Sequence, residues 1–206
     1  MAGDEEGLID SLREYIEDLE TYMEISRAGE ILRRYFVMNA FDGALTMLGF
    51  TVGSYISGLR DPHVIVSGGL GASIAMGVSG FVGALLSEKA EREREIRELE
   101  KILFTRLKGK GSIVERANML AVALAALTDA TAPGLAAIVS ALPFILSLYV
   151  PIAFFTAFIV SIALTLLIVF LLGVYLGVIS EENPVKYGIA MVLAGLLVSL
   201  ISFIHI

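Results

Sequence analysis

The chain has 206 residues, 56% of them apolar, with a net charge of −7 and no cysteine. Without cysteine, disulfides and thiolate metal sites are excluded, whereas oxygen, imidazole and thioether ligands remain available. Several apolar runs exceed the roughly 18 residues that mark a membrane-spanning helix. The composition therefore predicts an integral membrane protein, and we expect neither an enzyme nor a nucleic-acid-binding protein.

The first segment, residues 1–34, is acidic and amphipathic, which is typical of a cytoplasmic helix rather than of a cleavable signal. One face of this helix would carry the apolar side chains of Leu8, Leu12, Tyr15, Leu19 and Tyr22. The other sides would carry the acidic side chains of Glu14, Glu17, Asp18, Glu20 and Glu24.

About five apolar stretches follow, each near the ~20 residues that a bilayer requires. They cover approximately residues 35–57, 64–86, 117–148, 152–179 and 185–206. The third stretch is too long for one straight span and contains Pro133 and Pro143. Because proline removes a helix hydrogen bond, we expect a break or kink there.

The predicted fold class is thus an all-α membrane protein with five spans. It would consist of a cytoplasmic helix (1–34), two spans (35–87), a charged cytoplasmic segment (88–116) and three spans (117–206). With the N-terminus in the cytoplasm, the inner segments are 1–34, 88–116 and 180–184, with Lys186 at the edge of the last. They hold 14 of the 15 lysines and arginines, and only Arg60 faces out. This bias predicts an inner N-terminus and an outer C-terminus, and we expect a prokaryotic plasma membrane.

Small residues recur at every fourth position of the first two spans. They are Gly49, Gly53 and Ser57 in the first, and Gly69, Ser73 and Gly77 in the second. This spacing lets helix backbones approach closely in lipid. It predicts close packing, either of these two spans with each other or of two protomers.

A polar stripe interrupts the first span. Asn39, Asp42 and Thr46 are spaced three and four residues apart, so they share one helix face. Asp42 lies roughly 10 Å along the helix from Tyr35, and we expect it to be buried in protein. An acid in the membrane costs about 2.5–3.5 kcal/mol and commonly marks an ion or proton pathway. We therefore favour a functional role over a protonated carboxyl that only bonds a neighbouring helix.

A second acid, Asp129, precedes Pro133. A broken helix would expose carbonyl oxygens, which together with a carboxylate can bind a hard cation, although Asp129 could equally support the kink alone. Thioethers for a softer ion are offered by Met38, Met47 and Met76, but methionine in a helix usually fills the core. We expect the two histidines, His63 and His205, at the membrane interfaces.

The second apolar stretch continues without glycine or proline, so one helix should extend into the cytoplasm to about Leu107. Four of its acids are spaced three, four and three residues apart on one face: Glu88, Glu91, Glu95 and Glu98. A basic stripe of Arg94, Arg97 and Lys101 lies beside them. Like charges at these spacings destabilise a helix unless a cation faces them. A divalent-cation site and a merely solvated face explain the acidic stripe equally well.

Three segments resemble the vacuolar iron transporter family. "FDGALTMLGFTVG" (41–53) is similar to its first span, and "GGLGASIAMGVSGFVGALLSEKAERE" (68–93) is similar to its second span and charged helix. "FLLGVYLGVISEENPVKYGIAMVLAGLLVSLISFI" (170–204) is similar to its last two spans. The order of two spans, a cytoplasmic insert and three spans also matches.

The resemblance implies a five-span homodimer that moves Fe²⁺, and sometimes Mn²⁺, out of the cytosol in exchange for protons, along a path between the first spans. It matches Asp42 to the family's first-span aspartate. It also matches the start of the family's cytoplasmic metal-binding glutamates to Glu88, Glu91, Glu95 and Glu98. The expected cargo is therefore a divalent metal, with no permanently bound cofactor.

The sequence departs from the family pattern in the second span. A serine-methionine pair and then a glycine-glutamate pair are usual there, whereas this chain has Ser79-Gly80 and Gly83-Ala84. The insert, residues 88–116, is also shorter than the family's metal-binding domain. Met76, one turn earlier, is a candidate replacement ligand.

The expected translocation path therefore contains Asn39, Asp42, Thr46, Met76 and Asp129. Two other functions stay open. One is transport of another substrate on the same scaffold, which the missing second-span ligands favour. The other is a non-transporting membrane adaptor whose charged helices bind a partner protein.

Overall fold

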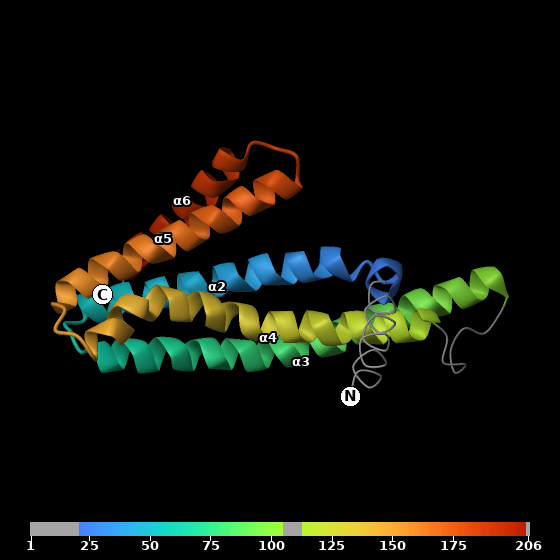
Figure 1. Ribbon diagram of the computed structural model, residues 1–206, viewed down its shortest axis with the longest axis horizontal. Helices are drawn as coiled ribbons and strands as arrows, with labels where there is room; N and C mark the ends of the chain where they lie inside the picture. Colours follow the sequence, from blue (N-terminus) through green and yellow to red (C-terminus); the bar gives the residue numbers. More distant parts are fainter. Residues whose placement is uncertain (1–20, 105–112, 205–206) are drawn as a thin grey trace, which may run out of the picture. The chain divides into compact units, whose positions relative to one another are not determined.

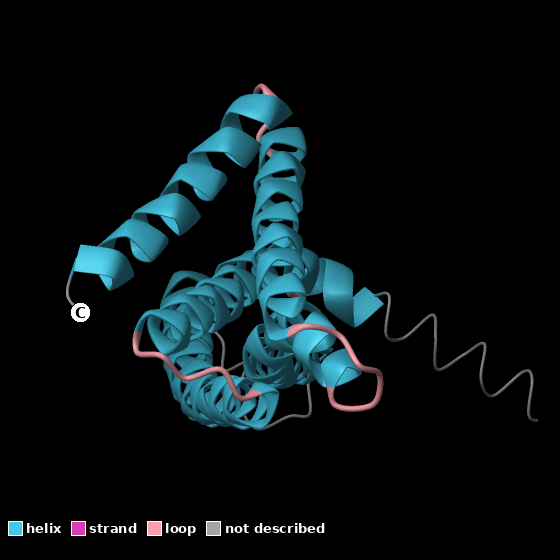
Figure 2. Cartoon of the chain, turned by 90° about the vertical axis from the view of Figure 1, so that its left-hand side faces the viewer, coloured by secondary structure: helices cyan, strands magenta, loops and turns pink. Residues whose placement is uncertain are grey.

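The computed structural model describes residues 21–104 and 113–204. These residues form helices joined by short turns, and no strand occurs among them (Figure 2). The long helices are α2 (Ala28–Ile56), α3 (Pro62–Leu103), α4 (Ile113–Ser147), α5 (Phe154–Ile179) and α6 (Pro184–Ile204) (Figure 1). All five are long and apolar enough to cross a membrane. The predicted all-α class and the five apolar stretches are confirmed.

The predicted and observed helix limits differ at a few ends. α2 begins at Ala28, well before the apolar stretch, because its first turns are helical but polar. α3 reaches Leu103, and the expected end near Leu107 lies outside the described residues. The acidic and apolar faces expected for residues 1–20 and the C-terminal His205 also lie outside them.

The break expected at Pro133 is absent, because α4 continues as one helix through both Pro133 and Pro143. Proline has no N–H, so each of these residues leaves the carbonyl four positions earlier without its usual helix donor. At Pro133, close packing of α2 against α4 supports the helix. A Cβ on Gly43 of α2 would overlap the carbonyl oxygen of Pro133.

The starts of α3 and α6 are capped by side chains. Asp61 Oδ1 accepts a hydrogen bond from the His63 N–H at 2.9 Å, just before α3. Asn183 Oδ1 accepts one from the Val185 N–H at 3.0 Å, with Pro184 at the first helical position of α6. Aspartate and asparagine before a helix, and proline at its first position, are favoured for this reason.

The chain divides into two compact units, and each is described by itself. The first unit comprises Met1–Arg34 and Phe81–Thr128, and the second comprises Tyr35–Gly80 and Asp129–Ile206. The core of the second unit lies between α2, α3, α4 and α5. Its buried side chains include Val37, Ala44, Ala132 and Val169 in one cluster and Met47, Ile65, Phe144 and Phe158 in another.

In the second unit, α5 and α6 form a hairpin whose helices contact each other and diverge from the turn that joins them (Figure 2). A Cβ on Gly173 of α5 would come within 2.7 Å of Gly188 Cα on α6. No side chain larger than hydrogen fits at that distance. Glycine at both positions therefore sets the close approach of these two helices.

The small residues of the first two spans pack within the chain. A Cβ on Gly69 would overlap the sulfur of Met47, and one on Gly77 would overlap the carbonyl oxygen of Ala130. Ser73 is buried and donates a hydrogen bond to the Gly69 carbonyl at 2.9 Å. The predicted close packing of the first two spans with each other therefore holds at Gly69, whereas Gly77 packs against α4 instead.

Candidate functional site

Two acidic side chains from different helices of the second unit lie near each other. They are Asp42 of α2 and Asp129 of α4: Asp42 adjoins Gly43, which packs against Pro133, one turn after Asp129. Neither carboxylate has a hydrogen bond or an ion pair with any residue in the described ranges, 21–104 and 113–204. The structure therefore brings together the two acids that the sequence singled out separately.

The two acids differ in their exposure. Asp129 is buried, with 7% of its surface exposed. Asp42 is exposed on the single chain, so the expectation that its own chain buries it is wrong. The reason is helical phase. Ala40 and Ala44 of α2 point into the core. Asp42 lies two residues from each of them. Because each residue turns a helix by 100°, its side chain points to nearly the opposite face. Met38, one turn before Asp42, is 59% exposed on that face.

Gly80 of α3 makes room for Asp129. A Cβ on this glycine would lie 2.9 Å from Asp129 Oδ1 and 3.3 Å from its main-chain oxygen. Pro133 has no N–H to donate to that main-chain oxygen. Two oxygen acceptors of one residue therefore face the same glycine, which is the kind of arrangement that can bind a cation.

The remaining residues of the predicted path have different environments. Thr46 Oγ1 donates a hydrogen bond to Met76 Sδ at 3.3 Å, so the structure brings Met76 of α3 to the polar stripe of α2. Asn39 Nδ2 donates to the carbonyl of Tyr35 at 2.8 Å, which leaves its side-chain carbonyl oxygen and one N–H for other partners. Met47 is fully buried and fills the core.

The acidic stripe on α3 belongs to the first unit, where arginines face it. Glu88, 8% exposed, lies 3.7 Å from Arg34 Nη2. The other contacts are Glu95 with Arg92 at 3.1 Å and Glu98 with Arg94 at 3.0 Å. The hydrogen bond and charge of Glu98 raise the pKa of Arg94. The chain itself therefore supplies cations for three of the four glutamates.

The four stripe carboxylates do not converge on one point. Within the described ranges, no group of three or more histidine, aspartate or glutamate side chains could hold a metal ion. Glu91 has neither a hydrogen bond nor an ion pair with another described residue. A metal site on α3 would therefore need a group from outside these ranges or from a second chain.

Sequence reasoning missed the role of Gly80. It counted this position only as the place of a lost family ligand, because the partner of a glycine is invisible along one helix. A signal was present, since a glycine in an apolar span often marks close helix contact. Which residue it contacts depends on the packing of α3 against α4.

No family model matches the chain. Over 179 residues it is 37% identical to the "Uncharacterized protein MJ0645" of Methanocaldococcus jannaschii, which covers 85% of this chain and 88% of the relative. The chain belongs to the family of this archaeal protein. The similarity extends along most of both chains, so it concerns the helical architecture as a whole and not one span.

Proposed function

We propose that the protein transports a divalent metal ion, Fe²⁺ or Mn²⁺, out of the cytosol in exchange for protons. The observation that supports this most directly is the neighbouring pair of Asp42 and Asp129, two carboxylates without partners on apolar helices. Two such charges repel each other, and a bound divalent ion or protons would relieve the repulsion. The resemblance to vacuolar iron transporters points to the same cargo.

The ligands would come from three helices. Asp42 would offer a carboxylate, and Asp129 a carboxylate and a main-chain oxygen beside Gly80. Met76, held by Thr46, would offer a thioether. Oxygen ligands suit Mn²⁺ and Fe²⁺, and a thioether increases the preference for the softer of the two.

Proton exchange follows from the chemistry of the same carboxylates. A carboxylate must be deprotonated to bind a metal, so metal binding releases protons and protonation releases the metal. If the site opens alternately to the two sides of the membrane, metal and protons cross in opposite directions. No permanently bound cofactor is required for this exchange.

A second protomer would explain why Asp42 is exposed on a single chain. In lipid, that carboxylate would cost about 2.5–3.5 kcal/mol. A homodimer in which the α2 helices face each other would remove Asp42 from lipid, and it would place the path between the first spans. We further propose a prokaryotic plasma membrane with the N-terminus inside, on the basis of the lysine and arginine distribution.

The test is uptake of Mn²⁺ and Fe²⁺ by proteoliposomes. Asp42→Asn and Asp129→Asn should each abolish flux, because each keeps its volume but loses a charge. The control is Asp61→Asn, which lies in the turn before α3, where asparagine caps a helix as well as aspartate. Full flux by both path variants would exclude the acid pair as the site. If the protein transports a different substrate and both variants lose that transport, the acid pair still lies on the path but the cargo is not Fe²⁺ or Mn²⁺.

A further inference from the structure

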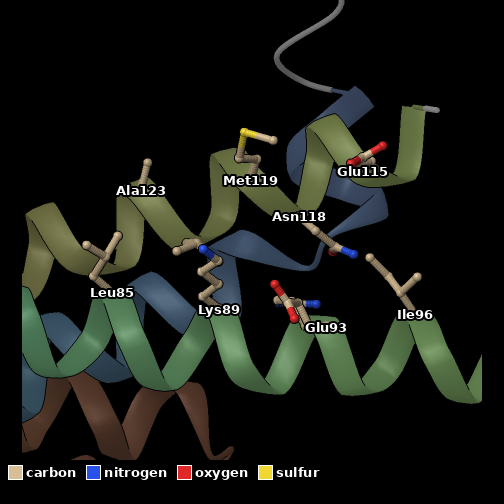
Figure 3. A pocket seen from close by; sticks show the side chains of 10 residues that line it. Leu85, Lys89, Glu93, Ile96, Glu115, Asn118, Met119 and Ala123 are labelled. Carbon is tan, nitrogen blue, oxygen red and sulfur yellow. The ribbon is translucent and has the colours of Figure 1, made fainter. Parts of the chain in front are cut away.

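A pocket lies between α3 and α4 in the first unit (Figure 3). The segment of α3 from Leu85 to Ile96 forms one wall, and the segment of α4 from Glu115 to Ala123 forms the other. Its volume is ≈ 330 Å³, at the lower end of the roughly 300–1,000 Å³ that small-molecule sites occupy. None of its residues belongs to the acid pair of the second unit.

Asn118 places an amide group in this pocket. It extends from α4 toward α3 and is only 9% exposed (Figure 3). Its amide has no hydrogen-bond partner within the described ranges. The amide can therefore donate to a ligand in the pocket that carries hydrogen-bonding oxygens.

Lys89 gives the pocket an uncompensated positive charge. Its ammonium group extends toward α4 (Figure 3), and it forms no ion pair with another described residue. The acids of the lining are already engaged. Glu93 lies 3.5 Å from Arg97, and Glu115 also has a partner. The lining therefore favours an anion.

The two ends of the pocket differ in polarity. Leu85 and Ala123 lie together at one end, whereas Asn118 and Glu115 lie toward the other (Figure 3). Lys89 is three residues past Leu86, the last residue of the apolar stretch, or about 4.5 Å along the helix axis. The headgroup layer of a bilayer leaflet is roughly 5–8 Å thick. Lys89 therefore lies at headgroup level, with the apolar end of the pocket toward the hydrocarbon.

We propose that this pocket binds the phosphate headgroup of an anionic phospholipid, with Lys89 pairing with the phosphate and the Asn118 amide donating to a phosphate or glycerol oxygen. The first acyl carbons lie along Leu85 and Ala123. A soluble phosphate would use the charge but not these apolar walls. An apolar peptide would use the walls but leave the charge unpaired.

The experiment measures lipid binding by the purified full chain, using native mass spectrometry and melting temperature. The probes are phosphatidylglycerol, phosphatidylcholine and soluble glycerol phosphate. The variants are Lys89→Gln, which removes the charge, and Asn118→Leu, which keeps a similar volume and removes the amide. The matched control is Lys101→Gln, an exposed lysine on the same helix about 18 Å farther along its axis.

Phosphatidylglycerol is expected to bind more tightly than phosphatidylcholine and to raise the melting temperature. Lys89→Gln and Asn118→Leu should each weaken its binding about tenfold, and Lys101→Gln should not. An equal loss in Lys101→Gln would mean non-specific charge attraction and would overturn the proposal. So would equally tight binding of glycerol phosphate, which would indicate a soluble ligand.

A third result would also overturn it. Lys89→Gln and Asn118→Leu could lower the melting temperature by the same amount with and without lipid. Lys89 and Asn118 would then stabilise the protein through contacts within the chain and not through a bound lipid. Because these measurements involve no flux, they do not depend on whether the protein transports a metal.

Discussion

Gly80 of α3 lies directly against the carboxylate of Asp129 of α4, and a Cβ at this glycine would come within 2.9 Å of Asp129 Oδ1. Real Cβ contacts are not this short, so a methyl group there must displace the aspartate. The relationship connects a small residue in one span with a buried acid in another. It also permits a test of Asp129 that leaves the acid itself unchanged.

Gly80→Ala should reduce metal flux because it displaces the carboxylate of Asp129 from its present position. Alanine in a helix normally gains about 0.5–1 kcal/mol over glycine, but the clash should cancel that gain. The matched control is Gly71→Ala on the same helix, where a Cβ meets nothing within 4 Å. Gly71→Ala should therefore keep full flux and melt slightly higher. Equal behaviour of the two variants would show that the position of Asp129 is not set by Gly80.

The acid pair predicts a pH-dependent response to metal. Lowering the pH protonates the carboxylates, and a metal ion must then displace those protons. The rise in melting temperature caused by saturating Mn²⁺ should therefore shrink as the pH falls and grow as it rises. Asp42→Asn should show little rise at any pH. Without metal, this variant should melt a few degrees higher than the parent, about 2–4 °C, because one charge of a repelling pair is gone.

Melting curves with and without Mn²⁺ across a pH series check this prediction, with Asp61→Asn as the control that keeps the parent's behaviour. A metal-induced rise that is the same at every pH would show that protons and metal do not compete. It would contradict the exchange mechanism, although it would not exclude metal binding itself.

The helices could be predicted from the sequence because span length and apolar composition are local properties, and all five were found within a few residues of most ends. The acid pair could not, since it depends on how α2 and α4 pack. Spacing placed Asn39, Asp42 and Thr46 on one face, but it did not say which way that face points. The buried alanines of α2, Ala40 and Ala44, decide this. They are visible in the sequence but resemble any other small apolar residues.

The acidic stripe of α3 leads to a prediction that differs from one based on the sequence alone. Four glutamates on one face indicate repulsion, so glutamine should stabilise the helix. The structure pairs Glu95 with Arg92 and Glu98 with Arg94, whereas Glu91 has no ion pair among the described residues and only a charge interaction with Arg94. Of the three, Glu91→Gln should therefore raise the melting temperature most or lower it least. Glu95→Gln and Glu98→Gln should leave it unchanged or lower it slightly, because each loses an ion pair.

Isothermal calorimetry with Mn²⁺ on the same variants tests whether the stripe binds divalent ions. If the stripe binds divalent ions, the combined replacement of Glu91, Glu95 and Glu98 by glutamine should reduce the number or affinity of the weak sites. Binding identical to that of the parent would show that the stripe is a solvated, arginine-paired face.

The exposure of Asp42 predicts where two protomers meet. Gly49 is a poor position for testing this, because it faces α6 of its own chain, where a Cβ would lie 3.5 Å from Val198 Cγ1. Met38 is better, since it is 59% exposed and lies one turn from Asp42 on the same face. The chain has no cysteine, so a single introduced thiol reacts alone.

In membranes, Met38→Cys should form a disulfide-linked dimer on mild oxidation, because facing α2 helices bring equivalent residues close together. A disulfide needs Cα atoms within about 7 Å, so only thiols at the interface can form one. The control is Ile74→Cys on α3, which is 68% exposed but lies on another helix of the same unit. It should remain monomeric on a non-reducing gel. Cross-linking of Ile74→Cys without cross-linking of Met38→Cys would place the interface on α3. Asp42 would then face lipid or another partner, and a path between two first spans would be excluded.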